Sequence, residues 1–166
     1  RALVASGAEL SVSGSGLQVR DAATGELLLP AVRGTLRLAA GSGGIWLGGT
    51  ATRAPRVQLS ASGPVTVGRN TYRATIVVTQ AGNTLQAVNH LDLEEFLYGV
   101  IGREMSPRWP AAALQAQAIA ARSYAVSRLS GRRGESYDFD AAAMIFGGYG
   151  AESESTRAAA DATRGL

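Results

Sequence analysis

The sequence contains no cysteine and no lysine, and it has a single histidine, His90. Without cysteine the chain can form neither disulfides nor thiolate metal sites, and one histidine cannot supply a multi-histidine metal site. A phosphate-binding loop of the G-x-x-x-x-G-K-[ST] type needs a lysine, so that class is excluded as well. Glycine-rich runs such as GSGGIWLGG are therefore interpreted as turns.

Long apolar runs are also missing. No continuous apolar run in the sequence is long enough to cross a bilayer, so we predict no transmembrane segment in this chain. The sequence has neither a starting Met nor a signal-like segment, and we expect Arg1 to be a processed or an artificial boundary.

The positive charge of the chain comes entirely from arginine. Sixteen arginines give a net charge of +3 and a pI near 9.8. Because a guanidinium grips carboxylates and phosphates with two parallel donors, an anionic polymer is one expected partner. A coding bias toward Arg and Ala is the alternative explanation. The arginines are scattered, and only Arg132 and Arg133 are adjacent. The sequence has no basic stripe with interleaved aromatic residues, so we predict no nucleic-acid binding.

The first half of the chain has the pattern of short β-strands. LSVSGSGLQVRD alternates apolar and polar residues, and thirteen of the 21 glycines precede His90. Such strands, separated by Gly and Ser, predict a β-rich domain over residues 1–88, built as a small barrel or a sandwich.

The second half is predicted to be helical, over residues 89–166. HLDLEEFLYGVIG predicts a helix that Asp92 caps, that buries one apolar stripe, and that Gly102 ends. A second helix is expected from around 106–110 to about Leu129, and GRRGES is expected to be a loop. SESTRAAADATRG predicts a third helix with Ser153 or Ser155 near its start. The fold class is therefore α+β, with the strands first.

Three glutamates have different interpretations. Glu94 and Glu95 lie in the first turn of the first predicted helix, where capping and the helix dipole account for them. Glu104 lies in the link GREMSP between two apolar helices, beside Met105 and Trp109. A carboxylate held against apolar groups suits a general acid, whereas spacing alone favours a surface residue in a tight turn.

Polar residues interrupt the alanine-rich second helix. Gln117 and Tyr124 are seven residues apart and share one face, while Gln115 and Arg122 share another. An unpaired polar group in such a packed helix costs about 1–3 kcal/mol, so partners are expected. One of these faces lines a groove, or Arg122 acts as an internal clamp on a loop or on the Glu104 turn; we favour the clamp.

The stretch VNHLDLEEFLYGVIGREMSPRWPAAALQAQAIAARSY, residues 88–124, carries a family resemblance. It resembles the core motif of the SpoIID/LytB family, named for stage II sporulation protein D and the LytB amidase enhancer. The upstream YRATIVVTQAGNTLQ and the downstream GGYGAESESTRAAADATRGL are similar to flanking segments of that family. The resemblance covers roughly residues 70–166.

The resemblance implies work on the cell wall. Family members studied as enzymes are lytic transglycosylases that act on peptidoglycan glycan strands without stem peptides and leave 1,6-anhydro-muramic ends. The family's catalytic glutamate corresponds to Glu104, acting as general acid and base. The alternative is a non-catalytic glycan-binding or amidase-enhancer module, with an N-acetylmuramoyl-L-alanine amidase as possible partner. Either implies export to the cell wall, the periplasm or the extracellular space, and no cofactor is expected.

The resemblance also suggests roles for further residues and shows departures. Gln117, Arg122 and Tyr124 would organise the groove, and Trp109 would stack on a sugar or, as we favour, anchor the start of the second helix in the core. The Cys and His zinc ligands of sporulation members are missing, so we predict no metal. Met144 replaces a family glutamine, and the sequence ends before a later family segment that would complete the groove.

Overall fold

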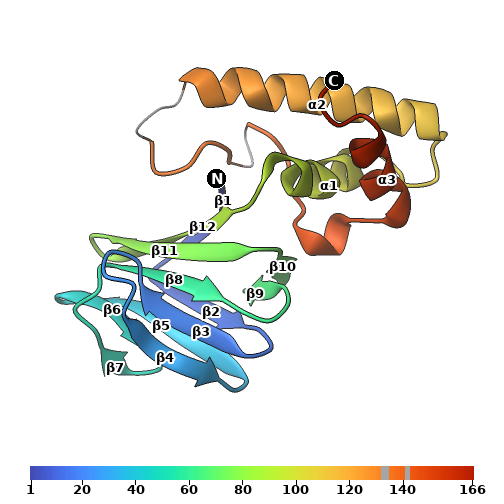
Figure 1. Cartoon of the computed structure of the whole chain (residues 1–166). Helices are drawn as coiled ribbons and strands as arrows, with labels where there is room; N and C mark the ends of the chain where they lie inside the picture. Colours follow the sequence, from blue (N-terminus) through green and yellow to red (C-terminus); the bar gives the residue numbers. More distant parts are fainter. Residues whose placement is uncertain (132–134, 141–142) are drawn as a thin grey trace. The chain divides into compact units, whose positions relative to one another are not determined.

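The computed structural model describes residues 1–131, 135–140 and 143–166. Half of the predicted loop GRRGES, residues 132–134 with Arg132 and Arg133, lies outside these ranges. The chain divides into two compact units, one formed by Arg1 and Leu3–His90, the other by Ala2 and Leu91–Leu166. Strands occupy the chain up to His90 and helices follow (Figure 1), which confirms the predicted α+β class.

The β unit is built from two six-stranded sheets. The strand order in the first sheet is β1 (Ala2–Gly7), β12 (Thr84–His90), β11 (Thr75–Ala81), β8 (Arg56–Ser60), β3 (Leu17–Asp21) and β4 (Leu27–Val32). The order in the second sheet is β10 (Asn70–Tyr72), β9 (Val65–Val67), β2 (Glu9–Ser13), β5 (Thr35–Gly41), β6 (Gly44–Leu47) and β7 (Thr50–Ala51). Both sheets have edges, so of the two predicted architectures the barrel was wrong.

The core of the β unit follows from the period-two pattern of its strands. In β3 the buried residues are Leu17 and Val19, and in β2 they are Leu10 and Val12. Alternate residues of a strand point to opposite faces, so each sheet presents one apolar face to the core. β12 packs against β2 and β5 of the other sheet. The polar alternates, such as Ser11 in β2, are left on the outer face.

The last two strands of the β unit lie within the segment of family resemblance. β11 and β12 pair antiparallel in the register Val77↔Val88, and Gly82 turns the chain between them with φ of +60°. A positive φ is easily adopted only by a residue without a β-carbon. At the end of β12 the buried Asn89 donates two hydrogen bonds through Nδ2, to the carbonyls of Arg73 (2.8 Å) and Thr75 (3.1 Å).

Three α-helices form the second unit in the residues described: α1 (Leu93–Glu104), α2 (Ala111–Gly131) and α3 (Glu154–Ala162), with a short 3-10 turn, η1 (Tyr149–Ala151), before α3. The Asp92 carboxylate accepts the Glu95 N–H at 2.9 Å, which confirms Asp92 as the cap of α1. Ser153 caps α3 in a reciprocal pair with Thr156.

Alanine allows the helices to pack closely. Ala118, Ala121 and Ala125 of α2 are buried, and α2 packs against both α1 and α3 (Figure 1). On another side of α1, Phe96 stacks on Phe139 with ring centroids 4.7 Å apart, and the ring of Phe146 lies tilted against Phe96 at 5.0 Å. These aromatic contacts hold the segment between α2 and α3 against α1.

The end of α1 differs from the prediction. Gly102 does not terminate the helix, which continues to Glu104. A β-carbon at Gly102 would overlap the Ala151 carbonyl, and one at Gly99 would lie 2.9 Å from the Gly148 carbonyl oxygen. These two glycines therefore allow the η1 segment to pack closely against α1. Gly102, interpreted from the sequence as a helix stop, is required for this packing.

Candidate functional site

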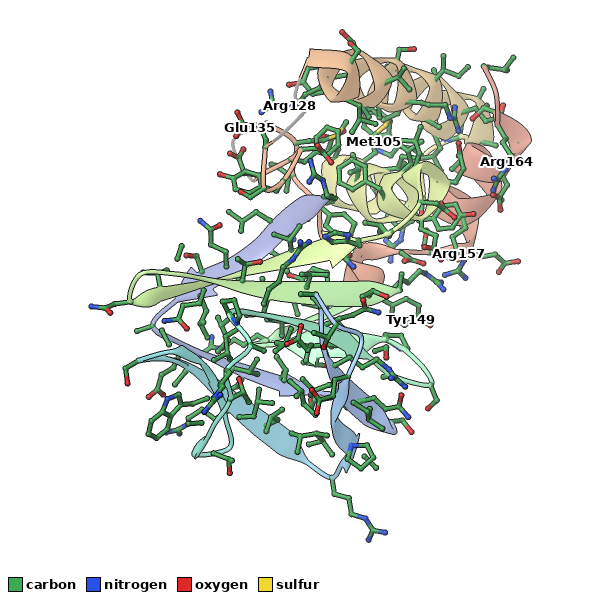
Figure 2. All side chains as sticks on the ribbon, turned by 60° about the vertical axis from the view of Figure 1, so that its left-hand side comes forward. Met105, Arg128, Glu135, Tyr149, Arg157 and Arg164 are labelled. Atoms are coloured by element: carbon green, nitrogen blue, oxygen red, sulfur yellow. The ribbon has the colours of Figure 1, made fainter. Side chains whose placement is uncertain are left out.

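Glu104 is the last residue of α1 and projects from its packed side. Leu97, Ile101 and Glu104 follow the i, i+4, i+7 spacing of one helix face, and the first two are fully buried. Met105, labelled in Figure 2, then adopts an extended conformation, and its N–H donates to the Ile101 carbonyl at 2.9 Å. The helix ends where the core ends, so the Glu104 side chain is exposed to solvent.

Gln117 of α2 is the partner of the Glu104 carboxylate. Its Nε2 donates to Oε2 of Glu104 at 2.6 Å. Hydrogen bonds to an ionised acceptor are short and about twice as strong as neutral ones. The amide occupies one carboxylate oxygen and leaves Oε1 available for a ligand. A glutamine in the middle of an alanine-rich helix is thus explained by a carboxylate at the end of the neighbouring helix.

The position of Glu104 does not favour stability. The C-terminal end of a helix carries a partial negative charge, so a carboxylate there is disfavoured by about 0.3–1 kcal/mol. Arg103, in the same last turn, is the residue type that this end favours. A carboxylate that is exposed, held in one orientation and unfavourably placed for the helix is a candidate for chemistry.

Tyr124 and Trp109 are both on the surface of the helical unit. Tyr124 is 46% exposed, two turns beyond Gln117 on the same flank of α2. Trp109 is 55% exposed, and its backbone N–H donates to the Ser106 carbonyl in the turn before α2. The expectation that Trp109 anchors this helix start in the core was wrong, because the turn keeps the indole outside. An exposed indole remains free to contact a ligand.

Arg122 lies inside the helical unit and acts as a clamp. Its Nε and Nη2 donate to the two carboxylate oxygens of Glu94, at 2.9 and 2.7 Å. Nη2 also donates to the Ala160 carbonyl at 3.0 Å, and Nη1 lies 3.4 Å from Oγ1 of Thr163. One guanidinium on α2 therefore binds α1 and the end of α3. The expected clamp is present, but its partner is Glu94 rather than the Glu104 turn.

The interpretation of Glu94 needs the matching correction. Capping and the helix dipole were expected to account for it, whereas it is buried and its carboxylate is fully engaged by Arg122. The two acidic residues of α1 that the structure singles out thus differ in kind: Glu94 is enclosed in an ion pair, and Glu104 is exposed beside a neutral amide.

Comparison with known proteins bears on the same half of the chain. The family model of SpoIID, described as stage II sporulation protein, matches residues 81–166, just over half of the sequence. The chain belongs to the SpoIID family. This is a family related to sporulation and associated with cell-wall peptidoglycan. Glu104 and Gln117 both lie inside the matched region, as does the Glu94–Arg122 pair.

A curated relative of this SpoIID-family chain is an uncharacterized protein of Brachyspira hyodysenteriae. It is 44% identical over 55 residues, which are 33% of this chain and 15% of the relative. The chain therefore matches only a small part of that protein's length. No solved structure matches the chain. In the described parts of this family member, none of the helices is long and apolar enough to span a membrane.

One cluster of the SpoIID helical unit had no signal in the sequence. The Tyr98 hydroxyl donates to Oδ1 of Asp161 at 2.6 Å, and Arg164 donates to the same oxygen at 3.2 Å. Burial, followed by this hydrogen bond, raises the pKa of Tyr98 to about 12. The same bond lowers the pKa of Asp161. Arg164 extends outward beyond α3 (Figure 2), and the cluster ties α1 to the end of that helix.

Metal binding was not expected from the sequence. Within residues 1–131, 135–140 and 143–166, no group of three His, Asp or Glu side chains gathers as potential ligands.

Proposed function

We propose that the protein is a lytic transglycosylase that cleaves peptidoglycan glycan strands without stem peptides, with Glu104 as the general acid and base. The observation that supports this proposal is the exposed Glu104 carboxylate, fixed through Oε2 by Gln117 at 2.6 Å. Membership of a peptidoglycan-associated family supplies the substrate class.

The reaction needs one carboxyl group. Most glycosidases use two carboxylates that flank the scissile bond. In the proposed reaction the 6-hydroxyl of the N-acetylmuramic acid residue is the nucleophile, so a second carboxylate to activate water is unnecessary. Glu104 donates a proton to the glycosidic oxygen, and the bond between C1 and that oxygen breaks. The 6-hydroxyl oxygen forms a new bond to C1, and its proton returns to Glu104.

Gln117 positions this carboxyl group. An amide N–H on Oε2 leaves Oε1 as the oxygen that carries and recovers the proton, in both halves of the reaction. General acid–base catalysis by a positioned side chain contributes about 10²–10⁴-fold to a rate. The exposed Trp109 and Tyr124 are the aromatic residues of this unit that we assign to contact sugar rings.

The test compares the wild type with Glu104→Gln. Both proteins are incubated with amidase-treated glycan strands, and the released fragments are analysed by mass. We expect anhydro-muramyl products from the wild type and a loss of about 10²–10⁴-fold in E104Q. The substitution removes a charge from a helix C-terminus, so the unfolding free energy of E104Q should stay within about 1 kcal/mol of the wild type.

The alternative is a glycan-binding or amidase-enhancing module without chemistry of its own. The same experiment separates the two. If both proteins bind the strands and neither releases anhydro products, the enzymatic proposal is wrong and the binding module is favoured. A purified N-acetylmuramoyl-L-alanine amidase, assayed with and without each protein, would then show whether strand binding stimulates the partner enzyme.

A further inference from the structure

An exposed tryptophan lies on the outer face of the second sheet of the β unit. Trp46 of β6 is 39% exposed, although large apolar side chains normally face the core. Its neighbours on β6, Ile45 and Leu47, are buried on the inner face. In the register of the sheet Trp46 is opposite Ala39 of β5 and Ala51 of β7, which are small. The indole is therefore not covered from either side.

Gly41 fixes how the indole lies. A β-carbon at Gly41 would overlap Nε1 and Cδ1 of Trp46. The ring consequently rests on the bare backbone of β5 instead of standing out into solvent. A ring already held against the sheet loses little conformational freedom when a ligand stacks on it, which favours binding.

Arg37 lies on the same outer face as Trp46. It is two residues before Ala39 on β5, so its Cα is a diagonal neighbour of Trp46, about 7–8 Å away. Its side chain is 71% exposed and only loosely paired with Glu9, at 3.6 Å. Such a surface pair contributes about 0–1 kcal/mol, so an incoming carboxylate can replace Glu9 at little cost.

The rest of this face carries several hydroxyl side chains. Ser11 and Ser13 of β2 and Thr35 of β5 point outward on it, since their alternates in the strands are buried. Short hydroxyl side chains leave space for a long ligand and offer it donors and acceptors.

The charge of the chain is concentrated in the part that carries this face. Residues 1–90 contain eight arginines and three acidic residues, a net charge of +5, whereas residues 91–166 contain eight arginines and ten acidic residues, a net charge of −2. A net positive unit attracts a polyanion over distances of about a Debye length.

We propose that this face binds glycan strands that carry carboxylated sugars, with a sugar ring stacked on Trp46 and a carboxylate of a neighbouring sugar on Arg37. The inference rests on the proposed function only in taking denuded glycan strands as the ligand. It gives the β unit a binding role that is separate from the chemistry of Glu104.

The test uses the full chain carrying Glu104→Gln, so that bound strands are not cleaved. The chain has two tryptophans, and adding Trp109→Phe leaves Trp46 as the sole tryptophan. Titration with amidase-treated strands should change the emission of Trp46. In calorimetric titrations of the E104Q protein, adding Trp46→Ala should raise Kd by about tenfold, which corresponds to ~1.4 kcal/mol.

Arg37→Gln provides a second variant that we expect to fold like the wild type, because the side chain is exposed. We expect it to raise Kd about fivefold for native strands, since a charge-assisted bond is lost, and to change nothing for strands whose carboxylates have been reduced to alcohols. Trp46→Phe, which keeps an aromatic ring over Gly41, should bind more tightly than Trp46→Ala.

The outcomes separate this inference from the proposed function. Unchanged Trp46 emission, or Kd values within twofold for both Trp46→Ala and Arg37→Gln, would overturn the binding face even if the wild type releases anhydro products. Strand binding that depends on Trp46 and Arg37, without products from the wild type, would uphold the face and refute the enzyme. Equal Arg37→Gln effects on native and reduced strands would contradict carboxylate recognition.

Discussion

The two glutamates Glu94 and Glu104 belong to the same helix, ten residues apart, and their surroundings differ. Arg122 neutralises Glu94 within the packed helices, where the ion pair holds three elements together. Glu104 stabilises nothing comparable: it is exposed at a helix end that disfavours negative charge. Residues that reduce stability and make no compensating structural contact are most often retained for function.

The first prediction concerns the amide that holds Glu104. Gln117→Met keeps the length of the side chain but removes the donor, so the carboxylate loses its fixed orientation. We expect kcat for strand cleavage to fall about tenfold with KM little changed, since the substitution affects positioning rather than binding. The measurement is the rate of release of anhydro-muramyl products at several strand concentrations.

Gln115→Met is the matched control for that variant. Gln115 lies on the opposite flank of α2, two residues from Gln117, and is equally half-buried. Its replacement should leave kcat unchanged. Equal losses in the two variants would indicate a general effect on α2 and would contradict a positioning role for Gln117.

A second prediction concerns the hydrogen bond from Tyr98 to Asp161. Because the folded-state pKa of Asp161 is lowered, this bond contributes stability above the ordinary carboxyl value of 3.8 and loses it as pH falls through the folded value. The pKa of Tyr98 is raised from 10.0 to about 12, so its contribution is fully present below pH 10 and is lost as the pH rises from there through about 12.

Tyr98→Phe should therefore reduce the unfolding free energy by about 0.5–1.5 kcal/mol between pH 5 and 9, toward the lower end because Asp161 is half exposed. The difference from the wild type should shrink below about pH 4, as Asp161 becomes protonated. Urea unfolding at pH 3, 5 and 7 measures it. A difference that stays constant over this range would show that the lost hydroxyl acts through packing alone.

Among the elements, α2 is the one to which the other two helices are attached. The Glu94–Arg122 pair is almost fully enclosed, with side-chain exposures of 6% for Arg122 and 10% for Glu94. Removing one partner leaves an uncompensated buried charge. Replacing both by apolar residues of similar volume removes that penalty, although the bonds of Arg122 to Ala160 and Thr163 are lost as well.

The third prediction follows as a double-mutant cycle. Arg122→Met and Glu94→Leu should each lower the unfolding free energy by about 3–5 kcal/mol, and the double variant should lose less than the sum by several kcal/mol. Chemical denaturation followed by circular dichroism measures all four proteins. Additive losses would mean that the two side chains do not act as a pair in solution.

Local signals in the sequence identified where helices begin. The end of α1 and the burial of its residues depend on tertiary packing, which local signals do not reveal. Asp92 and Ser153 were recognisable as caps because capping depends on residues three apart. Gly102 resembled a helix stop, since nothing local reveals that the η1 segment packs against it. Glu94 was misplaced because a single apolar stripe describes a helix packed on one side, whereas α1 packs against α2, α3 and η1.

For the site, the family resemblance named both Glu104 and Gln117, but the sequence did not show that their side chains are in contact. The contact with Gln117 joins two helices across a link of six residues, 105–110, and helical periodicity says nothing about the path of such a link. Trp109 was expected to anchor the start of α2 in the core, and the turn around Ser106 keeps it outside. The arrangement of a site at a helix junction is thus decided by the loop.

At the scale of the whole molecule, the separation of charge predicts how binding responds to salt. Residues 1–90 are net positive by five charges, while residues 91–166, which carry Glu104, are net negative by two. Carboxylated strands should therefore be attracted by the β unit and mildly repelled by the helical unit. Raising the ionic strength from about 0.1 to 1 M shortens the Debye length from ~10 to ~3 Å and weakens the attraction.

The fourth prediction is that Kd of the E104Q chain for native strands rises at least about tenfold over this range of salt, while Kd for carboxyl-reduced strands changes by less than about twofold. Calorimetric titrations at four NaCl concentrations measure both. If the helical unit alone bound the strand, added salt would screen the repulsion from its net negative charge, and Kd would stay constant or fall. A Kd for native strands that stays constant or falls with salt would therefore assign the dominant contact to residues 91–166 and contradict attraction by the β unit.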